Sequence, residues 1–96
     1  MKIQVTQEDI DQGIRGMCYS CPVARAINRH LREGYFSAVG IILIEIEDAK
    51  QIQFHEIDTP DIAAEFIRRF DHLSIRCTVE PIEFDLNIPE HLCLSK

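Results

Sequence analysis

The segment Val39–Glu47 has the strongest strand pattern in the chain, and it limits the folds that the sequence can adopt. Its second half alternates between isoleucines on one face and glutamates on the other (Ile42, Ile44, Ile46; Glu45, Glu47). Its first half is apolar on both faces, which is typical of a central strand. A turn at Asp48-Ala49 and a second alternating segment, Gln51–His55, follow, so we predict a β-hairpin.

A helix-start signal lies near the beginning of the chain, directly after a short alternating segment, Lys2–Val5. Thr6 and Asp9 have the spacing of a capping box, with aspartate in place of the usual glutamate or glutamine. We therefore predict a short strand followed by a short helix, which should end at Gly13 and Gly16.

Two further helices are predicted from prolines at a first helical position. Pro22 places Cys21 at the cap of a helix that we expect to end at Gly34, and Thr59 with Pro60 opens another. Each helix has an apolar stripe that should be buried (Val23, Ala26, Ile27, Leu31 in the first; Ile62, Ala63, Phe66, Ile67, Phe70 in the second).

The last predicted strand is bent. Apolar residues alternate over 75–79, Pro81 interrupts the pattern, and it resumes over 82–86, which is typical of a strand at a sheet edge. The element order is then β-α-α-β-β-α-β. We predict an α+β fold for residues 1–96, a single domain with a mainly antiparallel sheet of about four strands and helices packed on one face.

The charge of the chain is uneven. The net charge is −6; residues 1–44 carry five basic and four acidic side chains, whereas residues 45–96 carry five basic and twelve acidic ones. Proteins that bind nucleic acid do so mainly with clustered lysine and arginine, so nucleic acid is not an expected partner. An acidic half instead favours a partner with a basic surface.

The chain shows no targeting signal. Met1 and Lys2 lead directly into the first strand, and the longest apolar run, Val39–Ile44, is too short to cross a bilayer. We therefore predict a cytoplasmic protein that does not bind membranes. In that compartment its four cysteines are expected to be reduced.

Four segments together resemble a group of short hypothetical proteins encoded by bacteriophages and prophage-bearing bacteria. The segments are VTQEDIDQGIRG, CPVARAI, EFIRRFD and VEPIEFDL, in that order, and they cover less than half of the chain. The resemblance implies a small intracellular accessory protein of phage type, for which inhibition of a host factor would be a fitting role. It implies no catalytic residue.

The Cys18-x-x-Cys21 pair allows three interpretations. A zinc site would need two more ligands, for which Cys77, Cys93 and the histidines are the candidates. A redox site would use Cys21, whose thiol pKa a helix N-terminus would lower, although redox CxxC motifs directly follow a strand. Inert packing of reduced thiols is the third and favoured interpretation. We accordingly predict no cofactor and no enzymatic activity, with a zinc- or thiol-dependent protein as the alternative.

Two charged surfaces are candidates for binding a partner. A basic stripe should lie on the exposed face of the second helix (Arg25, Arg29, Arg32), and an acidic set should gather around the hairpin (Glu45, Glu47, Asp48, Glu56, Asp58). The sequence therefore favours a non-enzymatic protein-binding module. Pairing between copies through an edge strand, at Gln51–Ile57 or beside Pro81, is a further possibility.

Overall fold

The fold, seen in a computed structural model that describes residues 1–50, 54–72 and 79–94, is α+β. Within these ranges the elements are β1 (Lys2–Val5), α1 (Gln7–Gln12), α2 (Pro22–Asn28), β2 (Tyr35–Val39), β3 (Leu43–Asp48), β4 (Phe54–Asp58), α3 (Asp61–Asp71), β5 (Ile82–Asp85) and the 3₁₀ helix η1 (Glu90–Leu92).

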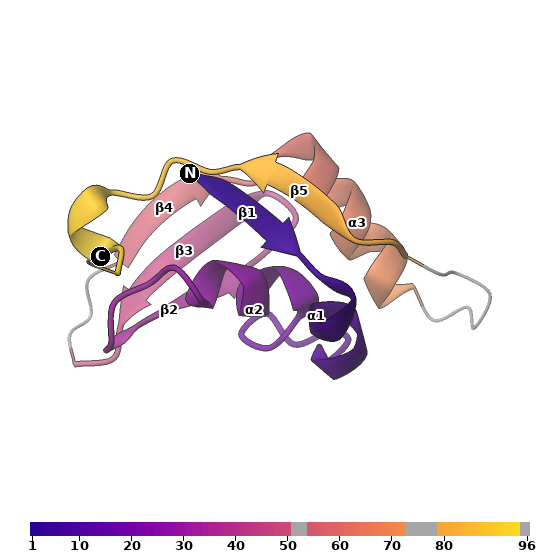
Figure 1. Ribbon diagram of the computed structural model, residues 1–96, viewed down its shortest axis with the longest axis horizontal. Helices are drawn as coiled ribbons and strands as arrows, with labels where there is room; N and C mark the ends of the chain where they lie inside the picture. The colour runs from indigo at the N-terminus through magenta and orange to yellow at the C-terminus, as the bar shows by residue number, and fades with distance from the viewer. Residues whose placement is uncertain (51–53, 73–78, 95–96) are drawn as a thin grey trace.

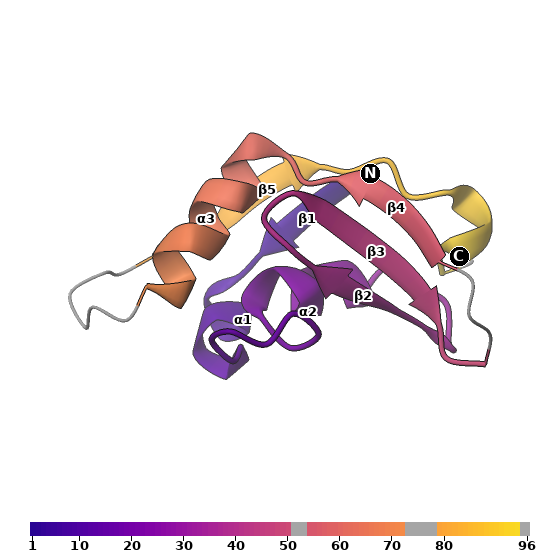
Figure 2. The ribbon, with the colours of Figure 1, turned by 180° about the vertical axis from the view of Figure 1, so that it is seen from behind.

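The strands form two antiparallel sheets (Figure 1). β1 pairs with β5, so that Ile3 lies opposite Phe84. β2, β3 and β4 form the second sheet with β3 at its centre, where Ile46 lies opposite Ser37 on one side and His55 on the other. β1, β5 and α2 lie in front of this sheet in Figure 1. Figure 2 shows that no described helix crosses its opposite face.

The predicted order and strand count were wrong because Val39–Glu47 is not one strand. β2 ends at Val39 and β3 begins at Leu43, and the Gly40 N–H closes the turn by donating to the Leu43 carbonyl at 2.9 Å. Ile42, expected to point inward, lies in this turn and is 79% exposed. In an unbroken apolar run, polar and apolar residues do not alternate, so the pattern cannot show where one strand ends and the next begins. For this reason the sequence pattern indicated neither β2 nor the β2–β3 hairpin.

The capping box at the start of α1 is confirmed. The Thr6 hydroxyl accepts from the Asp9 N–H at 3.2 Å, and the Asp9 carboxylate accepts from the Thr6 N–H at 3.0 Å. The helix ends at Gly13, as predicted, and a β-carbon there would lie 2.5 Å from Cδ of Pro22. Glycine therefore lets the end of α1 approach the start of α2 closely.

The predicted start of α2 is also confirmed, whereas its predicted end is wrong. Pro22 occupies the first position and the Cys21 sulfur accepts from the Ala24 N–H at 3.4 Å. The helix ends at Asn28 instead of Gly34, because the residues that follow bond to the chain near the C-terminus (Leu31 with Cys93; Arg32 with Leu92).

The start of α3 differs from the prediction, because Pro60 is the N-cap and Asp61 is the first helical residue. The Thr59 hydroxyl does not cap the helix but donates to the Gly40 carbonyl at 2.8 Å, tying the helix start to the β2–β3 turn. Ile62, expected in the buried stripe, is 48% exposed, and Ala64 is buried instead. The other four predicted stripe residues are buried (Ala63, Phe66, Ile67, Phe70).

One hydrophobic core lies between the two sheets and the helices. Its fully buried members come from β1, α2, β3 and α3 (Ile3, Val23, Ala26, Ile27, Ile44 and Ala63 among them). Two predicted segments fall outside the described residues. The first three residues of the predicted Gln51–His55 strand lie wholly outside them, and the predicted alternation over 75–79 lies outside them except for Val79. β5 follows Pro81, and Leu86, just after β5, is buried.

Candidate binding surfaces

Asp9 is a buried carboxylate where α1 meets α2. Its side chain has no exposed surface, and it accepts a bidentate pair of hydrogen bonds from Arg29, both 2.6 Å long. The Thr6 N–H also donates to it. The Arg25 Nε lies 3.4 Å from one carboxylate oxygen, which is an ion-pair distance, although it forms no hydrogen bond. The negative charge is therefore neutralised within the chain.

The pKa of Asp9 reflects a balance between burial and these partners. Burial raises the pKa, because a carboxylate loses its hydration when it leaves water. The hydrogen bonds from Arg29 and from the Thr6 backbone, with the positive charge of Arg29, outweigh burial and hold the pKa below the ordinary value of 3.8. Asp9 is thus ionised at neutral pH and acts as a structural group.

The prediction that Arg25, Arg29 and Arg32 share one helix face was wrong, because α2 ends at Asn28 and only Arg25 lies on it. Each of these arginines makes contacts within its own chain. Beyond Asp9, Arg29 donates to the Gln4 carbonyl at 2.9 Å, and Arg32 donates to the His91 carbonyl at 3.1 Å. These bonds use part of the donor capacity that a partner would need. Binding of a partner by the basic stripe stays a prediction. The intramolecular contacts give the arginines a structural role as well.

The cysteines are spread over different environments. Cys18 is exposed, Cys21 is buried and Cys93 is partly buried; all three are free thiols, and Cys77 lies outside the described residues. Burial raises the pKa of Cys21, and the N–H groups of the helix start only partly offset this. The lowered pKa expected from a helix N-terminus was therefore wrong, because that expectation ignored desolvation.

The metal interpretation finds no cluster in the described part of the chain. There, no group of three or more histidine, cysteine, aspartate and glutamate side chains is placed to hold a metal ion. Cys18 is exposed and lies in a turn, where its backbone carbonyl accepts from the Val39 N–H at 2.9 Å, whereas Cys21 is buried at the start of α2. The CxxC pair alone therefore supplies one exposed and one buried thiol.

The acidic residues of the hairpin gather on one face of the three-stranded sheet. Ile44 and Ile46 point into the core, so Glu45 and Glu47 lie on the opposite face, the one that no described helix crosses in Figure 2. The strand register adds two acidic residues of β4 to this face (Glu56 opposite Glu45; Asp58 opposite Leu43). We call these four residues, Glu45, Glu47, Glu56 and Asp58, the acidic face. Asp48, the last residue of β3, lies on the same face of the sheet as Ile44 and Ile46 and is not part of the acidic face.

Glu45 and Glu56 form a cross-strand pair of like charge. The Thr59 N–H donates to the Ile42 carbonyl, so Ile42 and Thr59 form a hydrogen-bonded pair of the ladder. Because hydrogen-bonded and non-hydrogen-bonded pairs alternate, Glu45 and Glu56 form a non-hydrogen-bonded pair, in which side chains are closest. Neither carboxylate has an ion-pair partner among the described residues. Like charges in this position destabilise a sheet.

Aromatic side chains lie next to the acidic face. The rings of Tyr19 and Phe36 are 5.5 Å apart and tilted by 58°. The Tyr19 hydroxyl donates to Glu47 at 3.4 Å, and the negative charge of Glu47 raises the Tyr19 pKa. Phe36 lies opposite Glu47 in the register. An aromatic pair thus adjoins the carboxylates on the same side of the sheet.

The segment between α1 and α2 exposes apolar side chains that the sequence patterns did not single out. Ile14, Met17 and Tyr19 are each about half exposed. They have neither the period of a helix nor that of a strand, so only their presence in a loop with two glycines could have indicated them. Tyr19 connects this loop to the acidic face.

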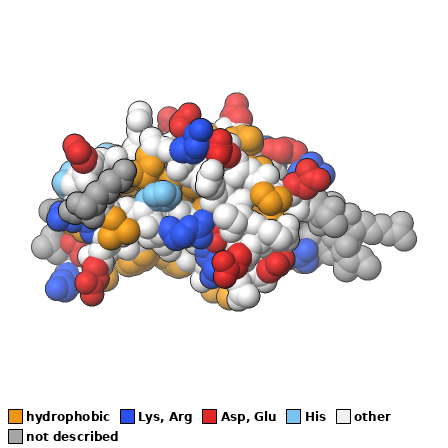
Figure 3. Space-filling view, in the orientation of Figure 1, with side chains coloured by type: hydrophobic (Ala, Val, Ile, Leu, Met, Phe, Trp, Pro, Cys, Tyr) orange, Lys and Arg blue, Asp and Glu red, His pale blue; other side chains and the backbone are white. Residues whose placement is uncertain are grey.

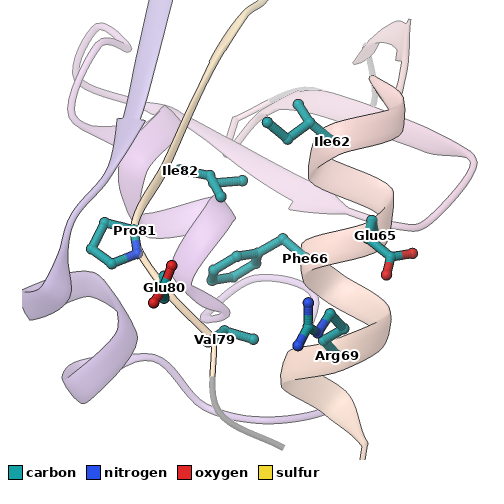
Figure 4. A pocket seen from close by; sticks show the side chains of 8 residues that line it. All are labelled: Ile62, Glu65, Phe66, Arg69, Val79, Glu80, Pro81 and Ile82. Atoms are coloured by element: carbon teal, nitrogen blue, oxygen red, sulfur yellow. The ribbon is translucent and has the colours of Figure 1, made fainter.

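A cavity of about 410 Å³ lies between α3 and the residues that lead into β5 (Figure 4). Phe66 and Ile62 from the helix and Ile82 from the strand point into it, as Figure 4 shows, and Glu65, Arg69 and Glu80 complete its charged rim. Sequence patterns did not predict this cavity, because it forms between elements that are distant in the chain.

Comparisons with known proteins give no family for this chain. No protein-family model, no curated protein and no solved structure matches it. Among the described residues, the helices are all too short or too polar to cross a membrane.

Proposed function

We propose that this protein is a non-enzymatic module that binds another protein through the acidic face, and that its partner presents a basic surface. The proposal rests on the like-charged pair of Glu45 and Glu56. Each is on the open side of the sheet, and together they lower stability by about 0.2–1 kcal/mol relative to a neutral or opposite pair. A partner with lysine or arginine at this point would remove the repulsion.

The surroundings of this pair have the composition of a protein interface. Interfaces combine an apolar, often aromatic centre with a polar rim. Tyr19 and Phe36 supply the aromatic part, while Glu47 lies beside both rings. Tyrosine is among the residues that most often dominate binding energy, because it buries a large area with few rotatable bonds.

The cellular setting is part of the proposal. Free thiols at Cys18, Cys21 and Cys93 are typical of the reducing cytoplasm. The resemblance to short phage proteins supports an accessory role there, and inhibition of a host factor is the form of protein binding that fits it. A basic host surface would attract the acidic face from a distance and increase the rate of association.

Affinity capture tests the proposal. The chain would be immobilised and exposed to extracts of candidate bacterial hosts at low salt, and bound proteins would be identified. The double variant Glu45→Gln/Glu56→Gln should lose the specific partner, whereas the exposed control Glu8→Gln/Glu90→Gln, with the same change in net charge, should keep it. Tyr19→Ala should weaken the same interaction.

Two results would count against the acidic face. If the two double variants capture the same proteins with the same yield, the interface lies elsewhere on the molecule. If the captured proteins lack a basic surface, or if binding does not weaken between about 0.05 and 0.5 M salt, charge complementarity is not its basis.

A further inference from the structure

The strands at the sheet edges differ in how their outward backbone groups are satisfied. On β2 every outward N–H has a partner in the chain (Tyr35 to the Arg32 carbonyl, Ser37 to the Asn28 side chain, Val39 to the Cys18 carbonyl). On β1 the outward carbonyl of Gln4 accepts from Arg29. The β2 edge is therefore closed to a further strand, and Arg29 occupies part of the β1 edge, which is how folded proteins avoid unwanted pairing.

The outer edge of β5 is open. Met1 and Leu86 exchange both backbone hydrogen bonds, at 3.1 and 2.8 Å, so they form a hydrogen-bonded pair. Because pair types alternate, Ile82 and Phe84 bond to β1, whereas the N–H and C=O groups of Glu83 and Asp85 point away from it. Within the described part of the chain, no backbone hydrogen bond satisfies these four outward groups.

The cavity beside α3 lies on the same side of β5 as its apolar side chains. Ile82 lines the cavity together with Phe66 and Ile62, and Phe84 on the same face is buried. Figure 4 shows α3 as the wall facing β5, with β1 on the other side of the strand. A strand added at this edge would therefore have α3 behind it and an apolar space next to it.

We propose that β5 receives an extended segment of another protein as a third strand, and that this segment alternates basic and apolar residues. Residues of the added segment that lie opposite Glu83 and Asp85 would point to the same solvent-facing side of the sheet as these two residues. Lysine or arginine there would complement the two carboxylates. A residue opposite Ile82 would face the cavity, and one opposite Phe84 would lie on the same, buried side of the strand, where valine, leucine or isoleucine would be buried. Backbone bonds supply affinity in such strand addition, and alternate side chains supply specificity.

The charges argue against a second copy as the occupant. In an antiparallel pair of β5 strands, Glu83 or Asp85 of one copy would lie opposite the same acidic residues of the other. Glu83 already contacts Lys2 at 3.3 Å, whereas Asp85 has no ion-pair partner among the described residues. Figure 3 shows acidic side chains along the upper margin of this face, where β5 runs in Figure 1. Such an edge repels its own copy and attracts a basic segment.

Two further features fit strand addition. Pro81 has the same outward phase as Glu83 but no N–H, so the ladder would end there without an unsatisfied donor. The β1–β5 sheet has two strands of four residues each, a size that is marginal alone and is stabilised by a third strand. This surface is separate from the acidic face of β3 and β4, so each can be tested without the other.

The experiment uses three capped hexapeptides with the full-length chain, followed by amide NMR spectra and hydrogen exchange. The peptides are Gly-Lys-Val-Lys-Val-Gly, its glutamate counterpart with Glu for Lys, and its polar counterpart with Ser for Val. We expect the lysine–valine peptide to shift and protect the amides of Glu83 and Asp85, which exchange faster than those of Ile82 and Phe84 in the free protein.

Variants at exposed positions separate charge from packing. Asp85→Lys should weaken the lysine–valine peptide about fivefold and favour the glutamate peptide. Ile62→Ser should weaken the lysine–valine peptide but leave the lysine–serine peptide unchanged, because only valine uses the cavity. Glu90→Lys, on η1, is the control for net charge and should bind all three peptides as the unaltered chain does.

Several outcomes would overturn the proposal. Equal binding of the lysine and glutamate peptides would exclude charge recognition, and shifts at Glu56 and Asp58 instead of β5 would place the segment on β4. Protection of Glu83 and Asp85 that grows with protein concentration in the absence of peptide would assign the edge to a second copy. If no partner is captured through the acidic face but the lysine–valine peptide still binds β5, the function proposed above is refuted and the strand-addition proposal is not.

Discussion

Replacing Arg29 should destabilise the protein more than replacing its partner Asp9. The reason is their unequal exposure: the Asp9 side chain is fully buried, whereas the Arg29 side chain is 46% exposed. When Arg29 is replaced by methionine, the Asp9 carboxylate stays buried without its bidentate partner. When Asp9 is replaced by asparagine, the Arg29 guanidinium can turn to water, and the amide oxygen can still accept from the Thr6 N–H.

The magnitudes follow from these contacts. Removing one partner of a buried ion pair costs about 3–5 kcal/mol, and because Arg25 remains 3.4 Å away we expect about 3 kcal/mol for Arg29→Met. Asp9→Asn loses charge-assisted hydrogen bonds without leaving a buried charge, for a cost of about 2 kcal/mol. The double variant should cost about 3 kcal/mol, because both single changes remove the same interaction, which gives a coupling energy of about 2 kcal/mol.

Urea unfolding followed by far-UV circular dichroism would measure these free energies. A domain of this size has a total stability of about 5–14 kcal/mol, so all three variants should still fold. The reasoning would be refuted if Asp9→Asn proved the more costly single change. It would also be refuted if the two costs added to within about 0.5 kcal/mol, since independent sites behave in that way.

Three other predictions concern pH, thiols and the acidic face. The folded-state pKa of Asp9 lies below 3.8, so the contribution of Asp9 to stability is present above pH 3.8 and is lost as the pH falls through the folded pKa. The stability of Asp9→Asn should therefore fall less steeply with decreasing pH than that of the unaltered chain, and equal slopes would contradict this. A thiol reagent should modify Cys18 rapidly and Cys21 only on unfolding, as peptide mass spectrometry with and without urea would show; rapid modification of both would mean that the helix start opens readily. Glu56→Lys, opposite Glu45, should raise stability by about 0.5 kcal/mol in urea unfolding and abolish partner capture; an unchanged midpoint would show that the carboxylates do not repel.

The elements that sequence patterns predicted correctly are those fixed by neighbouring residues. The Thr6–Asp9 box and the Cys21-Pro22 helix start involve atoms within three residues of one another, so local chemistry determines them. The end of α2 could not be found in this way. It depends on pairing between Leu31 and Cys93, which only the folded chain brings together.

The same distinction explains what was missed at the candidate sites. Asp9 and Arg29 are twenty residues apart, and each was assigned a local role, the first as a cap and the second as part of an exposed stripe. Their contact arises because Gly13 allows α1 and α2 to approach closely. The acidic residues of β3 and β4 were expected around a hairpin with its turn at Asp48-Ala49. Glu45 lies opposite Glu56, a register that a turn at those two residues would not give.

The distribution of carboxylates separates those that stabilise the fold from those that are available to a partner. Asp9 is buried with two arginines near it, so its charge is matched within the chain. Glu45 and Glu56 instead face each other on the uncovered side of the sheet. Stability alone would favour an opposite charge in one of these positions. A basic group lying against the pair would remove the repulsion, and for this reason the proposed function uses the acidic face and not the basic stripe.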